Sequence, residues 1–197
     1  CERRGLLLPL CELGVRGVAY LSRFTVSRGV NSSLSDADQA SVFTFARQER
    51  VAVHLNSWGS EGRVRNSTVV EEAIKVAHDE GRKIDIEENG ERVEVKLGMV
   101  IVWASGNQGA ENFSGFDYST VPQVIGVGAS THDDRRASYS NYGANIYMLA
   151  PAGETSSDSL VTTDNTDLIG GVDNGYNVDG SELDPAGTYT NSFSGTS

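Results

Sequence analysis

The sequence predicts an α/β fold, with a mostly parallel sheet and helices on both of its faces. Several short segments are almost entirely apolar, as strands are when both faces of a parallel sheet are covered. Segments with apolar residues at helical spacing separate these runs, so strand and helix alternate along the chain. Polar, glycine-rich motifs follow two of the runs, at the positions where such sheets gather their sites.

The first predicted elements lie in the first third of the chain. Val15 to Leu21 is a short apolar strand. Ser35 opens a helix with Asp38 as its capping partner, and this helix runs to about Arg50. The β-branched, apolar run Val51 to Ser57 is the next strand.

A second helix begins at a predicted capping box of Thr68 and Glu71 and stops at Gly81. Its apolar face is expected to combine four residues at helical spacing: Val70, Ala73, Ile74 and Ala77. Residues 82–97 then alternate apolar and charged residues around Asn89-Gly90, which predicts a β-hairpin. This hairpin is expected to be a surface insertion into the domain, and the alternative is a flap that binds a partner. In that hairpin Ile84 and Ile86 share a face, as do Val93 and Val95.

The remaining predicted strands are three apolar runs: Met99 to Ala104, Val124 to Ala129, and Asn145 to Ala150, which Pro151 closes. From Glu154 to Thr190 the chain is rich in Gly, Asp, Asn, Ser and Thr. This composition predicts a long loop that can include a hairpin.

Size and charge limit the classes of function. The 197 residues fit one domain with a sizeable core. The net charge is −11 and no Lys or Arg follows Arg136, which argues against nucleic acid as a partner because phosphates require a basic surface. The acidic surplus is either a solvated surface or a rim that attracts basic substrates or Ca²⁺. No apolar run approaches the roughly 18 residues of a membrane span, and Cys1 and Cys11 do not define a redox compartment.

Ser197, in the closing segment Ser-Phe-Ser-Gly-Thr-Ser, is the candidate nucleophile. A serine needs an adjacent base with an orienting partner, and the attacked carbonyl needs donors for its developing charge. Gly195 permits the backbone path of a sharp turn. Asn107 follows Gly106 at a predicted strand end, where its side-chain amide can serve as an oxyanion donor beside the Ser197 backbone N–H. The alternatives are a loop serine and a turn asparagine.

Ser57-Trp58-Gly59 follows another predicted strand and is a candidate substrate-binding segment. It could pair with a substrate backbone by strand addition, and Gly59 leaves room for that chain. The alternative is a strand end with a buried tryptophan. None of the three histidines, His54, His78 and His132, has the glycine-rich surroundings of an exposed catalytic histidine, so none is assigned as the base.

Six motifs in this order resemble the subtilisin-like serine proteases over about residues 11–197. They are residues 56–59, 104–109, 124–129, 139–143, 149–153 and 194–197. The resemblance implies a subtilisin-like three-layer fold, of which residues 1–197 are part of the peptidase catalytic domain. The triad order is Asp, His, Ser, so the Asp and His are expected before residue 1, and the piece alone is expected to be inactive.

The resemblance also implies the activity and its setting. It implies a serine endopeptidase that forms an acyl-enzyme on Ser197, acts on polypeptide substrates, is secreted or extracytoplasmic, and has a prodomain. It implies no cofactor for the chemistry and a structural Ca²⁺. The rival reading is a non-catalytic subtilase-like binding or structural domain. An esterase would show Gly-x-Ser-x-Gly around its nucleophile, and Ser197 does not lie in that pattern.

Within the family, the kexin- and furin-like proprotein convertases look nearest. The segment from Cys11 to Tyr20 is similar to their Cys-Gly-Val-Gly-Val-Ala pattern, with Glu12-Leu13 inserted. Asp117 could match the aspartate at the base of their pocket for a basic residue, or it could be an ordinary loop acid. Their paired acids after Trp-Gly are reduced here to Glu61, and their cysteines around Asp117 are absent.

Overall fold

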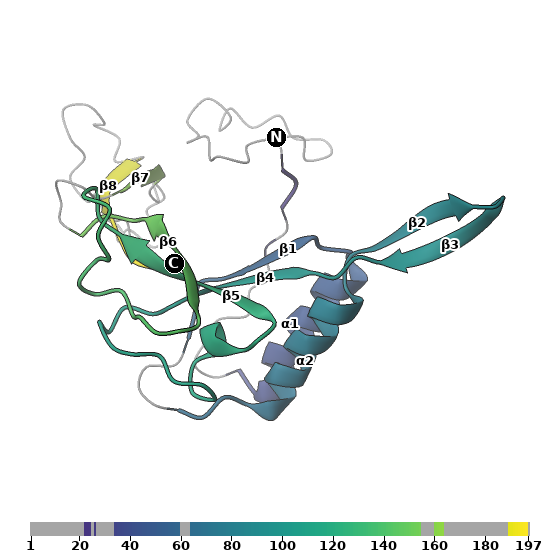
Figure 1. Cartoon of the computed structure of the whole chain (residues 1–197), viewed down its shortest axis with the longest axis horizontal. Coiled ribbons are helices and arrows are strands. Elements are labelled where there is room, and N and C mark those ends of the chain that lie inside the picture. Colours follow the sequence, from purple (N-terminus) through teal and green to yellow (C-terminus); the bar gives the residue numbers. More distant parts are fainter. Residues whose placement is uncertain are drawn as a thin grey trace, which may run out of the picture. The chain divides into compact units, whose positions relative to one another are not determined.

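The computed structural model describes residues 22–24, 26, 34–59, 64–154, 160–163 and 189–196 (Figure 1). The chain divides into two units, Val26–Glu154 with Gly195–Ser197, and Cys1–Thr25 with Thr155–Ser194. The predicted strand from Val15 to Leu21 and the residues Cys1, Cys11 and Glu61 lie outside the described residues.

The larger unit is built on a four-stranded parallel sheet in the order β1-β4-β5-β6 (Figure 1). Its strands are β1 (Val53–Asn56), β4 (Val100–Ala104), β5 (Val124–Ser130) and β6 (Ile146–Pro151). Each coincides with a predicted apolar run, and the pairing of β1 with β4, β4 with β5 and β5 with β6 is parallel throughout. The predicted α/β class with a parallel sheet is therefore confirmed.

The helix α1 (Asp36–Gln48) begins as predicted. Asp38 N donates to Ser35 Oγ at 3.2 Å, and Ser35 N donates to Asp38 Oδ2 at 3.2 Å. Both bonds of the capping box join residues three apart, so the local sequence is sufficient to specify this helix start.

The capping box predicted for α2 (Thr68–Glu80) is wrong, although the helix itself is present. Ser67 is the residue that precedes the helix, and its side chain makes no capping bond. Glu71 Oε1 instead accepts from Asn66 Nδ2 at 2.9 Å, and Ser67 N donates to Tyr118 Oη at 3.0 Å. These partners replace the local cap. The predicted stop at Gly81 is confirmed, since Gly81 N donates to Ala77 O at 3.0 Å.

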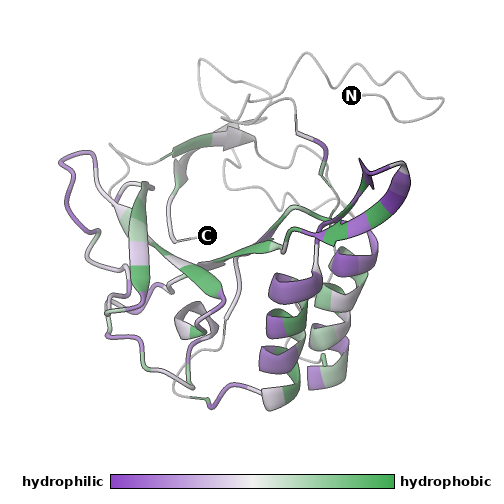
Figure 2. Ribbon diagram, turned by 45° about the vertical axis from the view of Figure 1, so that its right-hand side comes forward, coloured by the Kyte–Doolittle hydropathy of each residue, from purple (hydrophilic) through white to green (hydrophobic). Residues whose placement is uncertain are grey.

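The two helices pack against each other and against one face of the sheet, with their apolar sides turned toward it (Figure 2). The buried core joins both helices to β4 and β5 and includes Phe43, Ala46, Val70, Ile74, Ala77, Ile101, Trp103 and Val124. The predicted apolar face of α2 is thus the face that it buries. On the other side of the sheet, Val53 is 51% exposed and Leu55 is 71% exposed, and no helix of the described residues covers them.

The predicted β-hairpin is present and extends from the end of α2 (Figure 1). Strand β2 (Lys83–Glu88) pairs antiparallel with β3 (Glu91–Lys96), which places Ile84 opposite Val95 and Ile86 opposite Val93. Its charged residues form cross-strand pairs, as between Lys83 and Glu94 at 2.8 Å. That this hairpin is an insertion into the domain stays a prediction.

The smaller unit contains the antiparallel pair β7 (Leu160–Thr163) and β8 (Tyr189–Phe193). Leu160 lies opposite Phe193 and Thr163 opposite Tyr189. No helix in the described part of the chain is long and apolar enough to cross a membrane.

Candidate active site

The loop after β4 carries the motif Ala-Ser-Gly-Asn-Gln-Gly, and its shape depends on Gly106. This residue has φ +101°, a left-handed conformation that favours glycine. A Cβ atom there would lie 2.5 Å from Asn141 Nδ2 and 2.7 Å from Gln108 Oε1. Both the backbone angle and the close approach therefore require glycine directly before Asn107.

Asn141 holds this loop in place from the other side. Its Oδ1 accepts from the backbone N–H groups of Gln108 at 2.9 Å and Ala110 at 3.1 Å. Its Nδ2 donates to Gln108 Oε1 at 2.8 Å and to Asn112 Oδ1 at 2.9 Å. The side chain is buried and fully bonded, so it acts as a brace for the turn that carries Asn107. Sequence analysis assigned no role to this residue, although it lies in one of the six motifs.

The side chain of Asn107 is oriented by Thr196. Asn107 Oδ1 accepts from Thr196 N and from Thr196 Oγ1, both at 2.9 Å, and Thr196 Oγ1 in turn accepts from Gly106 N at 3.1 Å. Because the oxygen faces Thr196, the opposite end of the amide presents Nδ2 as a donor. Among the described residues Nδ2 makes no hydrogen bond, and a Cβ on Gly195 would lie 3.4 Å from it. Sequence analysis also missed this role of Thr196.

Gly195 makes the sharp turn that its position predicts. It has φ +129°, and its N–H donates to Tyr139 Oη at 3.1 Å. Tyr139 Oη donates to Gly153 O at 2.6 Å, so the tyrosine ties the end of the chain to the loop after β6. The predicted nucleophile, Ser197, lies two residues after Gly195 and is outside the described residues.

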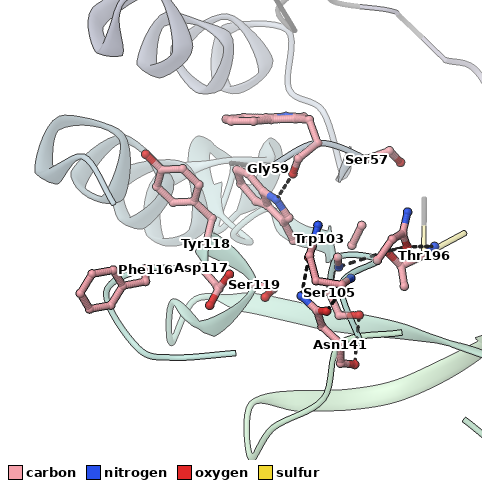
Figure 3. Close-up of a pocket in the computed structure, with 15 residues that line it drawn as sticks. Ser57, Gly59, Trp103, Ser105, Phe116, Asp117, Tyr118, Ser119, Asn141 and Thr196 are labelled. Atoms are coloured by element: carbon pink, nitrogen blue, oxygen red, sulfur yellow. Dashed lines mark hydrogen bonds between the residues drawn. The ribbon is translucent and has the colours of Figure 1, made fainter. Parts of the chain in front are cut away.

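A cleft of about 200 Å³ brings together the other predicted site residues (Figure 3). Its lining includes Ser57, Trp58, Gly59, Gly106, Asn107, Asp117 and Thr196. In Figure 3, Ser57 and Gly59 lie on one side and Ser105 and Asn141 on the other, while Asp117 and Tyr118 lie at the end away from Thr196. Residues from loops after β1 and β4 meet here because the carboxyl ends of parallel strands share one edge of the sheet.

One wall of the cleft is aromatic. The ring of Trp58 contacts that of Trp103 with centroids 4.7 Å apart and that of Tyr118 at 5.8 Å. Trp103 Nε1 donates to Trp58 O at 2.6 Å, which fixes the backbone of the segment, while Ser57 and Gly59 remain exposed. Trp58 is half-buried and packs against the core, and a substrate-binding role for its segment stays a prediction.

Among the described residues that line the cleft, Asp117 is the one that carries a charge. Its Oδ2 accepts from Phe113 N at 2.8 Å, which orients the carboxylate, and its side chain is half-buried. The neighbouring Phe116 also lines the cleft. A single carboxylate beside aromatic rings suits a cationic group, since rings and carboxylate both attract positive charge.

None of the three histidines lines the cleft, and that none of them is the catalytic base stays a prediction. His54 lies against Phe43 with ring centroids 4.9 Å apart, and burial lowers the pKa of its imidazole below the usual 6.5. His78 Nδ1 lies 2.8 Å from Asp79 Oδ1, and His132 Nε2 lies 3.2 Å from Asp133 Oδ1.

The described residues contain no group of three or more His, Cys, Asp or Glu side chains that could hold a metal ion.

Comparison with known proteins agrees with the motifs and the fold. A sequence model of the subtilase family matches residues 9–197. The chain is 30% identical over 191 residues to the calcium-dependent protease of Trichormus variabilis. This alignment covers 94% of this chain and 28% of that protein. It is 29% identical over 140 residues to the thermophilic serine proteinase of Bacillus sp., over 70% of this chain and 29% of that protein. The chain thus spans less than a third of the length of these relatives.

Solved structures share the fold. The structure of a serine protease of Aeromonas sobria superposes with a TM-score of 0.60 at 20% sequence identity, and the match covers 84% of this chain and 31% of that protease chain. The structure of a lanthipeptide protease superposes with a TM-score of 0.56 at 18% identity, and the match covers 85% of this chain and 49% of that chain. The kexin- and furin-like subgroup stays a prediction. With its parallel sheet, its cleft and a match over residues 9–197, the chain belongs to the subtilase family.

Proposed function

We propose that this chain is part of the catalytic domain of a serine endopeptidase that acts through an acyl-enzyme on Ser197. The observation that carries the proposal is the side chain of Asn107, whose Oδ1 is held by Thr196 so that Nδ2 is presented next to the nucleophile turn. A donor fixed in advance stabilises the charge of a tetrahedral intermediate without reorganisation during the reaction.

The proposed reaction proceeds in two steps. Ser197 Oγ attacks the scissile carbonyl carbon and passes its proton to a histidine, which the resemblance places before residue 1 with its orienting aspartate. The carbonyl oxygen becomes an oxyanion that accepts from Asn107 Nδ2 and from the Ser197 backbone N–H. The intermediate collapses, the amine leaves with the proton from the histidine, and water then hydrolyses the acyl-enzyme. A prodomain and secretion also belong to this proposal through the family resemblance.

In the proposed complex, the substrate backbone pairs with the segment Ser57–Gly59. The carbonyl of Trp58 is turned toward Trp103. Carbonyl directions alternate along an extended chain, so in the proposed complex those of Ser57 and Gly59 are expected to face the opposite way, toward an added strand. Apart from its chain neighbours, no described residue has an atom within 4 Å of the place of a Cβ on Gly59, so a substrate chain has room to approach there.

A serine-directed phosphonate is expected to label the full-length protein at Ser197, because only a triad-activated serine hydroxyl reacts readily with such reagents. Intact-mass and peptide analysis locate the modified residue. Ser197→Ala should abolish labelling and peptide hydrolysis together, while Ser194→Ala, three residues earlier, should retain both.

Labelling at another residue with activity retained would refute the assignment of Ser197. A full-length protein that lacks the upstream aspartate or histidine, and reacts with no phosphonate, would instead be the non-catalytic subtilase-like domain.

The cleft also suggests a preference for Arg or Lys before the cleaved bond. In the described part of its lining Asp117 is the only charge, and it lies at the end of the cleft away from Thr196, where a substrate side chain would reach it (Figure 3). A half-buried carboxylate that bonds a cation contributes about 1.5–3 kcal/mol, so its loss would reduce kcat/KM for basic substrates roughly 10- to 100-fold.

A peptide library assayed on the full-length parent and on Asp117→Asn tests this preference. The exposed Glu111→Gln removes a carboxylate outside the cleft lining and is the matched control. If the parent favours apolar residues, or if Asp117→Asn keeps its basic preference, Asp117 is a loop acid without a role in specificity.

A further inference from the structure

A buried amide lies beneath the proposed substrate-binding segment. Asn56 is the last residue of β1, directly before Ser57, and the residue is only 4% exposed. It stands opposite Trp103 in the parallel pair of β1 with β4. The residue does not line the cleft, and no step of the proposed reaction uses it.

The partners of Asn56 determine which way its amide points. Val102 O can only accept, so Nδ2 must face it, at 3.2 Å. Trp58 Nε1 can only donate, so Oδ1 must face the indole, also at 3.2 Å. The amide therefore joins β4 on one side to the ring of Trp58 on the other, and a carboxylate or an apolar side chain of the same shape could not make both bonds.

The same orientation determines the state of His54. Asn56 Nδ2 lies 2.9 Å from His54 Nδ1, so that ring nitrogen must accept and the imidazole is neutral with its proton on Nε2. Burial lowers the pKa of His54, which favours this neutral form. An Asn56 turned to offer its oxygen to the ring would favour the charged imidazole, but it would give up the bonds to Val102 and Trp58.

Trp58 is consequently held at two points. Asn56 Oδ1 holds its indole N–H, and Trp103 Nε1 holds its backbone carbonyl at 2.6 Å. The first bond determines where the ring stands in the aromatic wall of the cleft. The second determines which way the backbone between Ser57 and Gly59 is turned.

We propose that Asn56 is a positioning residue for substrate binding, which holds the Trp58 indole in the cleft wall and so keeps the segment Ser57–Gly59 ready to pair with a peptide. This inference rests on the proposed function and deepens it. Asn56 does not touch the reacting atoms, so its effect is on the affinity for the substrate and not on the chemical step.

In the full-length protein, Asn56→Ala is expected to raise KM for peptide substrates about five- to tenfold, the equivalent of about one hydrogen bond, while kcat per titrated active site changes less than about twofold. A merely structural role would lower the titrated active fraction and leave KM unchanged. Asn66→Ala is the matched control, because Asn66 is also buried but its side chain bonds Glu71, away from the cleft lining.

Circular dichroism supplies a second readout. Trp58 and Trp103 are the only tryptophans in these 197 residues, and indoles in contact couple their ultraviolet transitions. The difference between the spectra of the parent and of Trp58→Phe defines the exciton couplet due to this contact. The amplitude of this couplet is expected to fall by at least half in Asn56→Ala and to be unchanged in Asn66→Ala.

A double-mutant cycle tests the bond itself. Trp58→Phe removes the indole donor, so its effect on KM and that of Asn56→Ala should not multiply in the double variant. If Asn56→Ala does not fold, Trp58→Phe is measured alone, and an unchanged KM in Trp58→Phe overturns the proposal.

Three further results would each overturn the proposal: Asn56→Ala leaves both KM and the circular dichroism signal unchanged, Asn66→Ala raises KM as much as Asn56→Ala does, or the effects of Asn56→Ala and Trp58→Phe on KM multiply in the double variant. A parent that is not labelled at Ser197 would instead refute the proposed function.

Discussion

Replacement of Asn107 by alanine is expected to lower kcat of the full-length enzyme about 10²- to 10³-fold with little change in KM. This is the loss known for the oxyanion asparagine of subtilisin, the type member of the family, and it corresponds to about 2.7–4 kcal/mol of transition-state stabilisation. The amide of Asn107 is presented as a donor because Thr196 holds its oxygen. Since charge develops on the carbonyl oxygen only in the transition state, the loss appears in kcat.

Steady-state kinetics on a single peptide substrate, normalised to active sites titrated with a phosphonate, measure this effect. Asn145→Ala is the matched control, because it removes an amide that does not line the cleft. If kcat and KM are both unchanged in Asn107→Ala, this residue has no role in the mechanism. If KM rises while kcat is unchanged, Asn107 binds the substrate and the transition state equally well.

Asn141→Ala is expected to destabilise the catalytic domain by about 3–5 kcal/mol. The change deletes four hydrogen bonds and leaves the backbone N–H groups of Gln108 and Ala110 without their acceptor. Each net bond contributes about 1 kcal/mol, so the four lost bonds account for this loss. For a domain of this size the transition temperature should fall by roughly 10 °C. The turn that carries Asn107 loosens at the same time, so kcat should fall as well.

Thermal unfolding of the full-length protein, followed by calorimetry, measures this loss. Asn66→Ala provides the comparison, because the side chain of Asn66 is also buried but makes one hydrogen bond, to Glu71. Its expected loss is about 1 kcal/mol. Equal losses in the two variants would contradict the bracing role of Asn141.

The family comparisons extend these expectations only as far as the chain reaches. The relatives named as proteases are more than three times as long as the part matched here. Catalysis is therefore expected of the full-length protein, in which a histidine and an aspartate complete the triad.

Strands and helices were predictable because their signals are local. The apolar runs of β1, β4, β5 and β6 and the face of α2 appear directly as periodicity, and each is present. The capping box at Ser35 was predictable for the same reason, since both of its bonds join residues three apart. The capping box predicted from the similar pattern at Thr68 and Glu71 was wrong. Glu71 instead forms a hydrogen bond with Asn66, and the backbone of Ser67 forms one with Tyr118, which is far away in the sequence.

The candidate site divides in the same way. By itself the sequence determined the motifs, their position after parallel strands, and hence the residues that meet in the cleft. Only the tertiary structure decided what holds them. Asn107 is oriented by a residue 89 positions away and its loop is braced by one 33 positions away, while the bond from Asn56 to Val102 spans 46 positions. A hydrogen bond depends on which atoms the fold brings within about 3 Å, and between such distant residues it leaves no periodic trace in the sequence.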